Sequence, residues 1–305
     1  MSVQSDQLLG ELRSAGFAIA YRMLGSVGEA EDIVQEALLR FHRAREGDER
    51  IESPRAYVAT VATRLAIDQL RSARARRESY VGEWLPEPLV ADVEETPARQ
   101  AEMADSLSLA FLVLLESLSP EQRAVLLLRD VFDYAYDEIA GIVGKSEDNV
   151  RQLASRARRH VEEGRPRFEA SREQRDELAR RFFAAAQGGE MAALESLLAE
   201  DVVLHGDGGG RVPALARSLH GRRRVAGTLL AWARQGAKTA GTAIRQVEVN
   251  GQPGGLMLDG EGRVIGVMAL DIADEQIQGV RSIVNPDKLR HVGPVGDMRA
   301  LLGRR

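Results

Sequence analysis

Apolar positions in the first 80 residues repeat at the three- and four-residue spacing of amphipathic helices. One stripe runs through AEDIVQEALLRF (30–41), and another follows Ser53-Pro54, a good N-cap and first-turn pair. The pattern predicts helices throughout this segment. Residues 79–100 then carry three prolines and several acids, which indicates a linker. Because Trp84 in its WLPEP stretch is more hydrophobic than a free tether needs, we expect this linker to dock on another part of the chain.

Helical signals resume at about Met103 and become strong at Ser119-Pro120-Glu121-Gln122, a capping box with proline at the first helical position. The helix that it opens is expected to run through Asp130. A short helix over 136–143 is stopped by Gly144, and Ser146 caps a third helix. A short helix, a tight turn containing glycine and a longer helix have the spacing of a helix-turn-helix.

The pattern changes after Pro166, where helical stretches give way to strands. The helices are expected at 171–187, 190–198 and 221–234, with a first strand, DVVLH, at 201–205. Four further strands are expected at 241–250, 254–259, 263–272 and 277–284, separated by glycine clusters. Helices followed by strands predict an α+β domain with an antiparallel sheet.

Composition excludes several classes of protein. The chain has no cysteine, so it has neither disulfides nor thiolate metal sites, and this is typical of a reducing cytoplasm. Its N-terminus lacks the pattern of a secretory signal, and its longest apolar run, 107–115, is about half of what a bilayer span needs. We therefore expect a soluble cytoplasmic protein without a membrane partner.

The net charge of −5 hides a strong segregation of charge. Residues 29–36 hold four carboxylates and no cation, whereas residues 64–77 hold five arginines and one aspartate. Phosphate binding depends on local basic patches rather than on the total charge. The sequence therefore keeps nucleic acid open as a partner.

The helix expected at 146–161 separates apolar from basic residues. Its apolar side carries Val150, Leu153, Ala154, Ala157 and Val161. Its other side carries Arg151, Gln152, Ser155, Arg156, Arg158 and Arg159. A lone helix of this kind is usually just a solvated basic face. The capped helix-turn-helix in front of it favours a DNA-recognition helix, since guanidinium groups clamp phosphates or pair with guanine in the major groove.

Two polar faces in the first segment are further candidates for binding. Asp32, Gln35 and Glu36 lie at i, i+3 and i+4 on one helix, opposite its apolar stripe, where they could receive a basic partner surface. On the helix from Pro54 the outward-facing residues are Arg55, Thr60, Arg64 and Arg71, with Tyr57 nearby and Arg74, Arg76 and Arg77 following. Such a face could follow a separated DNA strand through phosphate contacts and base stacking.

Together these stretches resemble a known family. Residues 30–44 and 53–77 resemble the core-binding and minus-ten-reading region of extracytoplasmic-function sigma factors, and residues 118–161 resemble their minus-thirty-five-reading region. The resemblance implies that Asp32, Gln35 and Glu36 meet the clamp helices of the beta-prime subunit of core RNA polymerase. It implies promoter DNA as the second partner, bound by Arg55, Tyr57, Thr60, Arg64, Arg71, Ser146, Asn149, Arg151, Gln152, Ser155, Arg156, Arg158 and Arg159. Gln152 and Leu153 depart from the family pattern, so the promoter sequence is not carried over.

The stretch HGDGGGR (205–211) first suggests a phosphate-binding loop. A P-loop needs Lys-Ser/Thr at the start of a helix after its last glycine, whereas Arg211-Val212-Pro213 follows here. A dinucleotide fingerprint also fails, because the three glycines are consecutive and no βαβ unit is expected. From the residues alone the stretch is a flexible turn.

The last third resembles the SnoaL-like cone, an α+β fold that sigma factors of the SigJ type carry in place of a separate anti-sigma protein. WLPEP, a DGGGK-like motif and NPDKL mark that subgroup, and all three occur here, with Arg211 replacing lysine. The resemblance implies regulatory contacts at Trp84, Leu85, Pro86, Asp207, Gly208, Gly209, Gly210, Arg211, Asn285, Pro286, Asp287, Lys288 and Leu289. We expect the glycines to allow close backbone approach, so that the linker and NPDKL dock near the cone mouth.

The expected fold is therefore multidomain, with two all-α sigma domains, the second carrying the helix-turn-helix, followed by a SnoaL-like cone. The expected boundaries are 1–80 for the first sigma domain, 81–102 for the linker, 103–165 for the second sigma domain and 168–305 for the cone. The function implied is a sigma factor that directs transcription initiation and is regulated by its own cone, without a cofactor.

Two alternatives stay open. The cone could be an enzyme, a cyclase or isomerase, with acid–base groups drawn from His205, Asp207, His220, Asp259 and Asp271. Fold does not imply function, and no catalytic motif is matched. The other alternative is a helix-turn-helix regulator whose cone senses a metabolite, and a small ligand in the cone cavity is compatible with either scheme. The five histidines lack metal-ligand spacing, so we expect no metal.

Overall fold

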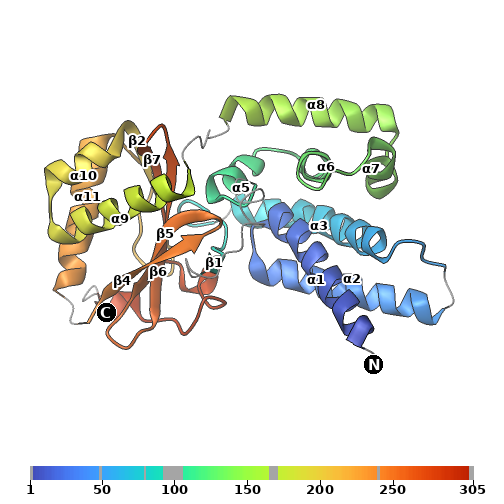
Figure 1. Cartoon of the computed structure of the whole chain (residues 1–305), viewed down its shortest axis with the longest axis horizontal. Helices are drawn as coiled ribbons and strands as arrows, with labels where there is room; N and C mark the ends of the chain where they lie inside the picture. Colours follow the sequence, from blue (N-terminus) through green and yellow to red (C-terminus); the bar gives the residue numbers. More distant parts are fainter. Residues whose placement is uncertain are drawn as a thin grey trace. The chain divides into compact units, whose positions relative to one another are not determined.

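The computed structural model describes residues 3–47, 50–78, 80–91, 106–164, 171–238 and 241–301. The chain forms two compact units (Figure 1). Unit 1 combines residues 1–79 with 112–165, and unit 2 combines residues 80–111 with 166–305. We call residues 80–91 the linker segment. It belongs to unit 2. The rest of the expected linker, 92–102, lies outside the described residues.

Unit 1 begins with three helices, α1 (Val3–Leu24), α2 (Val27–Glu46) and α3 (Pro54–Glu78). Ser26 caps α2 by accepting a hydrogen bond from the Glu29 amide. The apolar stripe predicted for α2 is buried against the rest of this unit, which confirms the helical period.

The second helical segment of unit 1 contains α6 (Pro120–Asp130), α7 (Tyr136–Val143) and α8 (Glu147–Gly164), preceded by α5 (Leu109–Leu115). The capping box at Ser119 is present, Gly144 ends α7 with a φ of 67°, and Ser146 accepts from the Asn149 amide. These observations confirm the predicted helix-turn-helix spacing. The apolar side of α8 is buried at Val150, Ala154, Ala157 and Val161.

A buried arginine joins the two helical segments of unit 1. Arg123 on α6 donates to the Met23 carbonyl on α1 (2.6 Å) and pairs with Glu116 (2.7 Å). Burial lowers the pKa of Arg123 to about 9, so its guanidinium stays charged at neutral pH. The ion pair and the carbonyl partly offset the cost of burying that charge.

Unit 2 is an α+β domain around one sheet. Its strands are β1 (Val90–Ala91), β2 (Leu198–Asp207), β3 (Leu219–His220), β4 (Ala243–Val249), β5 (Gln252–Leu258), β6 (Val264–Ala273) and β7 (Gln276–Ile283), in the order β1-β4-β5-β6-β7-β2-β3. The fully antiparallel sheet expected from the sequence is wrong at one place, because β2 and β7 run parallel. The long excursion between them, through a helix and four strands, provides the crossover that a parallel pair requires.

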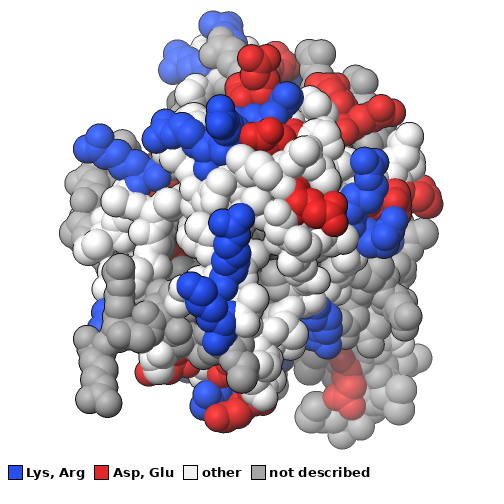
Figure 2. Space-filling model, turned by 90° about the vertical axis from the view of Figure 1, so that its left-hand side faces the viewer, with Lys and Arg blue, Asp and Glu red and all other residues white. Residues whose placement is uncertain are grey.

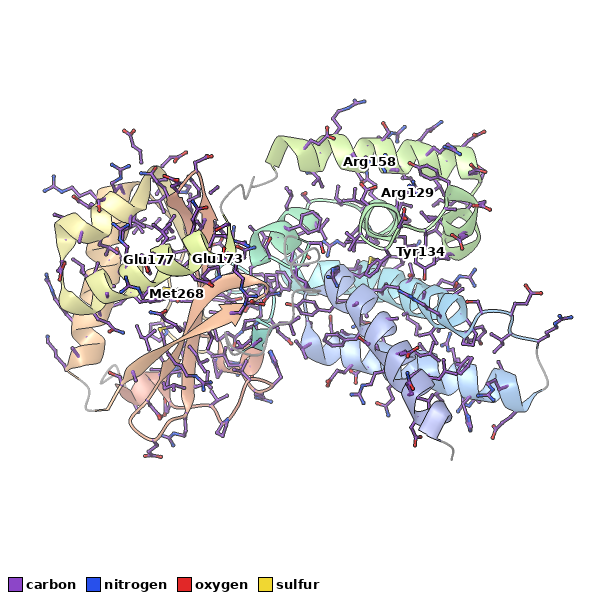
Figure 3. All side chains as sticks on the ribbon, viewed as in Figure 1. Arg129, Tyr134, Arg158, Glu173, Glu177 and Met268 are labelled. Atoms are coloured by element: carbon purple, nitrogen blue, oxygen red, sulfur yellow. The ribbon has the colours of Figure 1, made fainter. Side chains whose placement is uncertain are left out.

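Three helices cover one face of this sheet: α9 (Arg172–Gly188), α10 (Met191–Leu197) and α11 (Arg222–Ala237). They pack a core cluster of apolar side chains against that face, including Leu204 of β2 and Met268 of β6, the latter labelled in Figure 3. Side chains alternate along a strand, so His205 and Asp207 point to the opposite face. That face receives the linker segment, as the contacts below show.

After β7 the described residues form a 3₁₀ turn, η3 (Pro286–Lys288), and a short helix, α12 (Met298–Leu301). On the face shown in Figure 2, basic and acidic side chains are interspersed, and neither positive nor negative charge dominates it.

Within the part of the chain that the structure describes, no helix is long and apolar enough to cross a membrane.

Candidate functional site

The carboxylate of Asp207, at the end of β2, binds three groups from distant parts of the sequence. The Tyr80 hydroxyl donates to its Oδ1 (2.6 Å), and the Leu85 amide donates to its Oδ2 (2.8 Å). The Lys288 ammonium binds the same Oδ2 (2.7 Å). Asp207 is fully buried and Lys288 is 6% exposed, so this ion pair is shielded from solvent. These four residues, together with Asn285, are called the Asp207 cluster.

Lys288 holds the linker through more than its charge. It also donates to the Leu85 carbonyl, and its ammonium lies over two aromatic rings, 4.9 Å from the centroid of Tyr80 and 4.4 Å from that of Trp84. A desolvated cation over a ring gains electrostatic attraction from the ring quadrupole. Trp84 in the linker therefore serves as a docking group for a lysine of NPDKL.

The triple glycine allows this close packing. A Cβ on Gly209 would lie 2.2 Å from Nδ2 of Asn285, and one on Gly208 would lie 2.4 Å from the Val212 carbonyl oxygen. Gly209 and Gly210 also have φ of 57° and 69°, which favours glycine. The HGDGGGR stretch is thus a turn whose missing side chains make room for the terminal segment. Asn285 in turn donates to the Tyr80 hydroxyl oxygen (2.8 Å).

Further contacts continue along the linker segment. Leu89 and Asn250 exchange two hydrogen bonds of 2.8 Å, and β1 pairs with β4 as an added edge strand. His291 binds the Pro88 carbonyl oxygen (2.7 Å), and His205 pairs with Glu83 (2.5 Å). The linker is therefore held along its whole described length, with the Asp207 cluster as its buried centre.

The remaining predicted regulatory residues lie around this centre. Leu85 and Leu289 are fully buried and Pro86 is buried, whereas Pro286 is half-buried. Arg211 is exposed and pairs with Asp287 (3.0 Å) across the same end of the domain. The structure thus brings the three motifs that the sequence singled out into one place.

The environment of the cluster perturbs Tyr80. Burial raises the pKa of its hydroxyl well above the ordinary value, and the hydrogen bond to the Asp207 carboxylate raises it further. Tyr80 therefore stays protonated at neutral pH and acts as a donor. A proton donor beside a carboxylate in a closed contact is suited to holding a segment in place.

The predicted DNA-recognition face of α8 is exposed except at Arg158. Arg158 is half-buried and reaches toward α6 (Figure 3), where its Nε donates to Asp130 (2.9 Å). Arg151 pairs with Glu147 and lies 4.4 Å from the ring centroid of Tyr136. The exposed residues of this face are Ser146, Asn149, Arg151, Gln152, Ser155, Arg156 and Arg159.

The predicted strand-reading residues of α3 are partly engaged inside unit 1. Arg64 donates to the carbonyls of Ile142 (2.8 Å) and Gly141 (2.9 Å) at the end of α7. Arg71 pairs with Glu121 of α6 (2.6 Å). In this conformation the guanidinium groups that would meet DNA bind the helix-turn-helix segment instead.

The other candidates on α3 divide by exposure. Arg55 is exposed, whereas Tyr57 is half-buried with its ring centroid 6.0 Å from that of Phe41. Thr60 donates its hydroxyl to the Ala56 carbonyl (2.8 Å). The side chains of Arg74, Arg76 and Arg77 lie outside the described residues.

The predicted core-binding face of α2 is available. Asp32 and Gln35 are exposed, and Glu36 is half-buried beside Arg40 (2.7 Å). Leu39, on the same side of the helix, is 41% exposed. Sequence reasoning missed Leu39, although its i+3 spacing from Glu36 would have placed it on this face.

The candidate acid–base groups of the enzyme alternative have structural partners. Beyond His205 and Asp207, Asp271 forms a nearly buried ion pair with Arg281 (2.9 Å), and Asp259 binds the Arg263 side chain (2.8 Å). His220 contacts the Ser218 hydroxyl (3.2 Å). Among the described residues, no group of three or more potential ligands is placed to hold a metal ion.

Sequence reasoning also missed part of the linker's binding site. Tyr80, Asn250 and His291 fall outside the three motifs, yet each binds across the contact. Tyr80 offered one signal, as an aromatic residue at the start of the linker beside Trp84. Asn250 and His291 offered none, because only the folded sheet brings them to the linker.

Comparisons with known proteins match both helical segments. The family model Sigma-70 region 2 matches residues 9–76, and Sigma-70 region 4 matches residues 108–161. The ECF RNA polymerase sigma factor SigJ of Mycobacterium tuberculosis is 35% identical over 297 residues, which cover 95% of this chain and 94% of that relative. The probable ECF RNA polymerase sigma factor SigI of the same organism is 33% identical over 274 residues, or 89% and 90% of the two chains.

A solved structure agrees with these relatives. The crystal structure of Mycobacterium tuberculosis SigJ covers 96% of this chain and 100% of its own, with a TM-score of 0.76 and 32% sequence identity. The similarity confirms the expected multidomain fold, with helical sigma domains followed by a sheet-containing α+β domain. This chain belongs to the extracytoplasmic-function RNA polymerase sigma factors.

Proposed function

We propose that unit 2 regulates this sigma factor by holding the linker segment in the Asp207 cluster. The observation that carries the proposal is the buried pair between Asp207 and Lys288, closed over by Tyr80, Leu85 and Trp84 of the linker. Charges are removed from water only where specific partners offset the cost. A contact of this kind is either fully made or absent, which suits a two-state control.

The partners follow from the family and from the exposed faces. Core RNA polymerase would bind Asp32, Gln35 and Glu36, with exposed Leu39 adding apolar contact beside the acids. Promoter DNA would bind the exposed face of α8 and the outward face of α3. Because core polymerase works in the cytoplasm, we place this protein there.

Release of α3 is a requirement of this scheme. Arg64 and Arg71 bind α7 and α6, so they could contact DNA only after the two helical segments part. Arg71 and its partner Glu121 are partly exposed, and solvent screens ion pairs of this kind so that they contribute little to stability. That contact alone is therefore weak enough for DNA phosphates to replace.

The proposed domains are those expected from the sequence: 1–80, 81–102, 103–165 and 168–305. A catalytic role is not part of this proposal, since the candidate acid–base groups serve ion pairs and turn contacts. Family membership favours the sigma role over a helix-turn-helix regulator that works without polymerase.

The test is transcription in vitro with purified core polymerase and the full chain, comparing Lys288→Met with Lys238→Met. Lys288→Met keeps the chain length but leaves the Asp207 carboxylate without its cation, and breaking a buried pair costs about 3–5 kcal/mol. We expect transcript yield to change by about tenfold or more while core binding is unchanged, since about 1.4 kcal/mol already corresponds to tenfold. Lys238 is exposed at the C-cap of α11. Its substitution should leave transcript yield and core binding unchanged.

Linker release is followed in the same samples through Trp84 fluorescence, in a Trp232→Phe background that removes the other tryptophan. Trp84 should become solvent-exposed in Lys288→Met. A released Trp84 with unaltered transcription would show that docking does not control initiation. A Trp84 signal identical to that of the parent chain would show that Lys288 does not hold the linker.

A further inference from the structure

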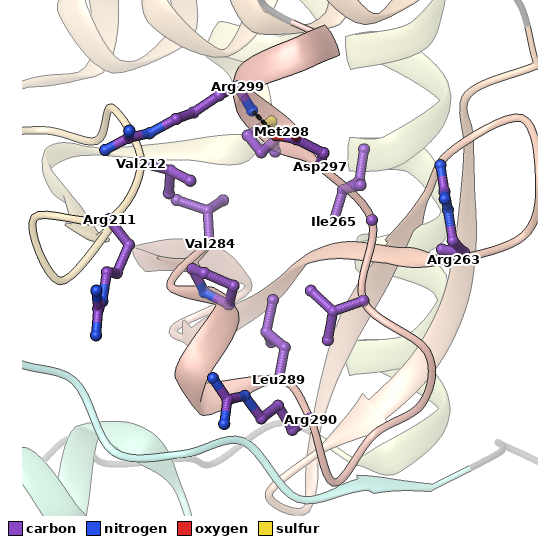
Figure 4. Close-up of a pocket in the computed structure, with 13 residues that line it drawn as sticks. Arg211, Val212, Arg263, Ile265, Val284, Leu289, Arg290, Asp297, Met298 and Arg299 are labelled. Carbon is purple, nitrogen blue, oxygen red and sulfur yellow. Dashed lines mark hydrogen bonds between the residues drawn. The ribbon is translucent and has the colours of Figure 1, made fainter. Parts of the chain in front are cut away.

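A pocket of about 550 Å³ opens in unit 2 beside η3 (Figure 4). Its walls come from the loop after β2, the start of β6, the end of β7 with η3, and residues 290–299. The volume is within the range of about 300–1,000 Å³ that small-molecule sites occupy. None of the residues that line the pocket belongs to the apolar core cluster between the helices and the sheet. The pocket is therefore separate from that core.

The middle of the pocket is apolar. Ile265, Val284 and Leu289 stand near its centre in Figure 4, and Ile265 and Leu289 are buried. Met298 and Val212 extend this lining on the α12 side. An apolar surface of this kind favours the hydrocarbon part of a ligand, since its burial removes nonpolar area from water.

The rim of the pocket is strongly basic. Four arginines line it, Arg211, Arg263, Arg290 and Arg299, whereas Asp297 is its single acidic lining residue. In Figure 4 the four arginines surround the apolar centre. The lining residues therefore carry a net charge of about +3, from four arginines and one aspartate.

Nearby carboxylates compensate the rim on one side and leave an excess of positive charge on the other. Asp287 serves both Arg211 (3.0 Å) and Arg290 (2.6 Å), so one negative charge faces two positive ones. Arg263, on the other side, pairs with both Asp259 (2.8 Å) and Glu261 (3.2 Å), so its charge is compensated. No ion pair to the Arg299 side chain is found among the described residues.

We propose that this pocket binds a small organic carboxylate with an apolar body, the charge held by the arginine rim and the body by the apolar centre. Planar guanidinium groups match the two oxygens of a carboxylate, which makes such pairs geometrically specific. An inorganic anion would leave the apolar centre unused, and a neutral apolar compound would leave the excess positive charge beside Arg211, Arg290 and Arg299 unmatched. The site therefore selects for both parts in one molecule.

The position of the pocket connects it to the linker contact. Pro286 and Leu289 line the pocket, while Lys288 between them holds the linker in the Asp207 cluster. A ligand would thus contact the same short turn that docks the linker. This coupling rests on the proposed function, whereas ligand binding itself does not.

The test is isothermal titration calorimetry of the full chain with 2-naphthoate as the probe. Three compounds serve as controls: 2-naphthalenemethanol lacks the charge, acetate lacks the body, and inorganic phosphate tests for anion binding alone. We expect saturable binding of 2-naphthoate and at least tenfold weaker binding of the other three.

Protein variants locate the binding. Arg290→Gln/Arg299→Gln removes two rim charges at exposed positions and should weaken 2-naphthoate binding at least tenfold, with an unchanged melting temperature. Met298→Trp fills the pocket and should abolish binding. Arg234 lies at an exposed position of α11, outside the pocket. Arg234→Gln is therefore the matched control and should bind 2-naphthoate as the parent does.

Three results would each overturn the proposal: no binding of 2-naphthoate, equal binding of the alcohol or of phosphate, or unaltered binding by the two pocket variants. None of these measurements involves polymerase or promoter DNA. Their failure is therefore distinct from a failure of the proposed regulation, which transcription measures.

Discussion

At Asp207 a single carboxylate binds residues that lie as far as 127 positions away from it in the chain. Its oxygens accept from a hydroxyl, an amide and an ammonium group. The contacts with the amide and the ammonium are buried, and the contact with the Tyr80 hydroxyl is partly buried. Loss of one partner leaves the others desolvated and unpaired, which costs far more than a single exposed hydrogen bond. The cluster therefore responds to perturbation as a unit.

Tyr80 provides a test of that burial through its ionisation. Burial and the hydrogen bond to Asp207 raise its pKa above the ordinary value of about 10, so the folded state holds this proton more tightly than the unfolded state does. The contribution of Tyr80 to stability should be complete below about pH 10 and be lost as pH rises through the folded-state pKa. The ultraviolet titration curve of the Tyr80→Phe variant is subtracted from that of the parent chain. The difference reports Tyr80 alone among the five tyrosines.

We expect the Tyr80 signal to appear only at pH values above that of an ordinary tyrosine. In Asp207→Asn the transition should move to lower pH, because the carboxylate that opposes ionisation is gone. A Tyr80 that titrates at about pH 10 in the folded parent would contradict a buried, hydrogen-bonded hydroxyl.

At the scale of helices and strands, local chemistry was enough to predict much of the fold. The capping box at Ser119, the left-handed Gly144 and the apolar stripe of α2 each depend on neighbours within a few residues, and the structure confirms them. The parallel pairing of β2 with β7 could not be predicted in this way, because a strand's partner is decided by packing of the whole sheet.

The same distinction holds for the candidate site. The motif residues Trp84, Asp207 and Lys288 were found through a family resemblance, and the structure brings them together. Asn250 and His291 were missed, since their contact with the linker depends on where β4 and the terminal segment end in space. The engagement of Arg64 with α7 was equally invisible, because it joins residues 77 and 78 positions apart.

The proposed DNA-binding face of α8 can be tested at Arg156. Arg156 is exposed on the proposed DNA face, and no ion pair to it is found among the described residues. Arg156→Ala should weaken promoter binding, and for a phosphate contact it should reduce the slope of log affinity against log salt by about 1. Fluorescence anisotropy with labelled promoter DNA across a salt series measures both.

Arg234→Ala is the control, since it removes an exposed arginine from unit 2 rather than from α8. Arg158→Ala is less informative, because Arg158 also ties α8 to Asp130 of α6. Promoter affinity and salt slope that match the parent in Arg156→Ala would remove Arg156 from the DNA interface.

At the scale of the whole molecule, the course of the chain relates the linker to the sigma segments. The chain leaves unit 1 after α3, runs through the linker segment in unit 2, and returns to unit 1 within α5. In the proposed scheme, holding the linker on unit 2 would oppose the separation of α3 from the helix-turn-helix. Such a tether would shift the population between a closed and an open form.

The most direct test of this account is amide hydrogen exchange at Leu85 and Leu89, whose N–H groups bind Asp207 and Asn250. The measurement compares the free chain with the chain bound to core polymerase on promoter DNA. We predict slow exchange in the free chain and clearly faster exchange in the complex, as the linker leaves the Asp207 cluster. Equal protection in the two states would show that the linker stays docked during initiation, and would contradict control of this sigma factor by linker release.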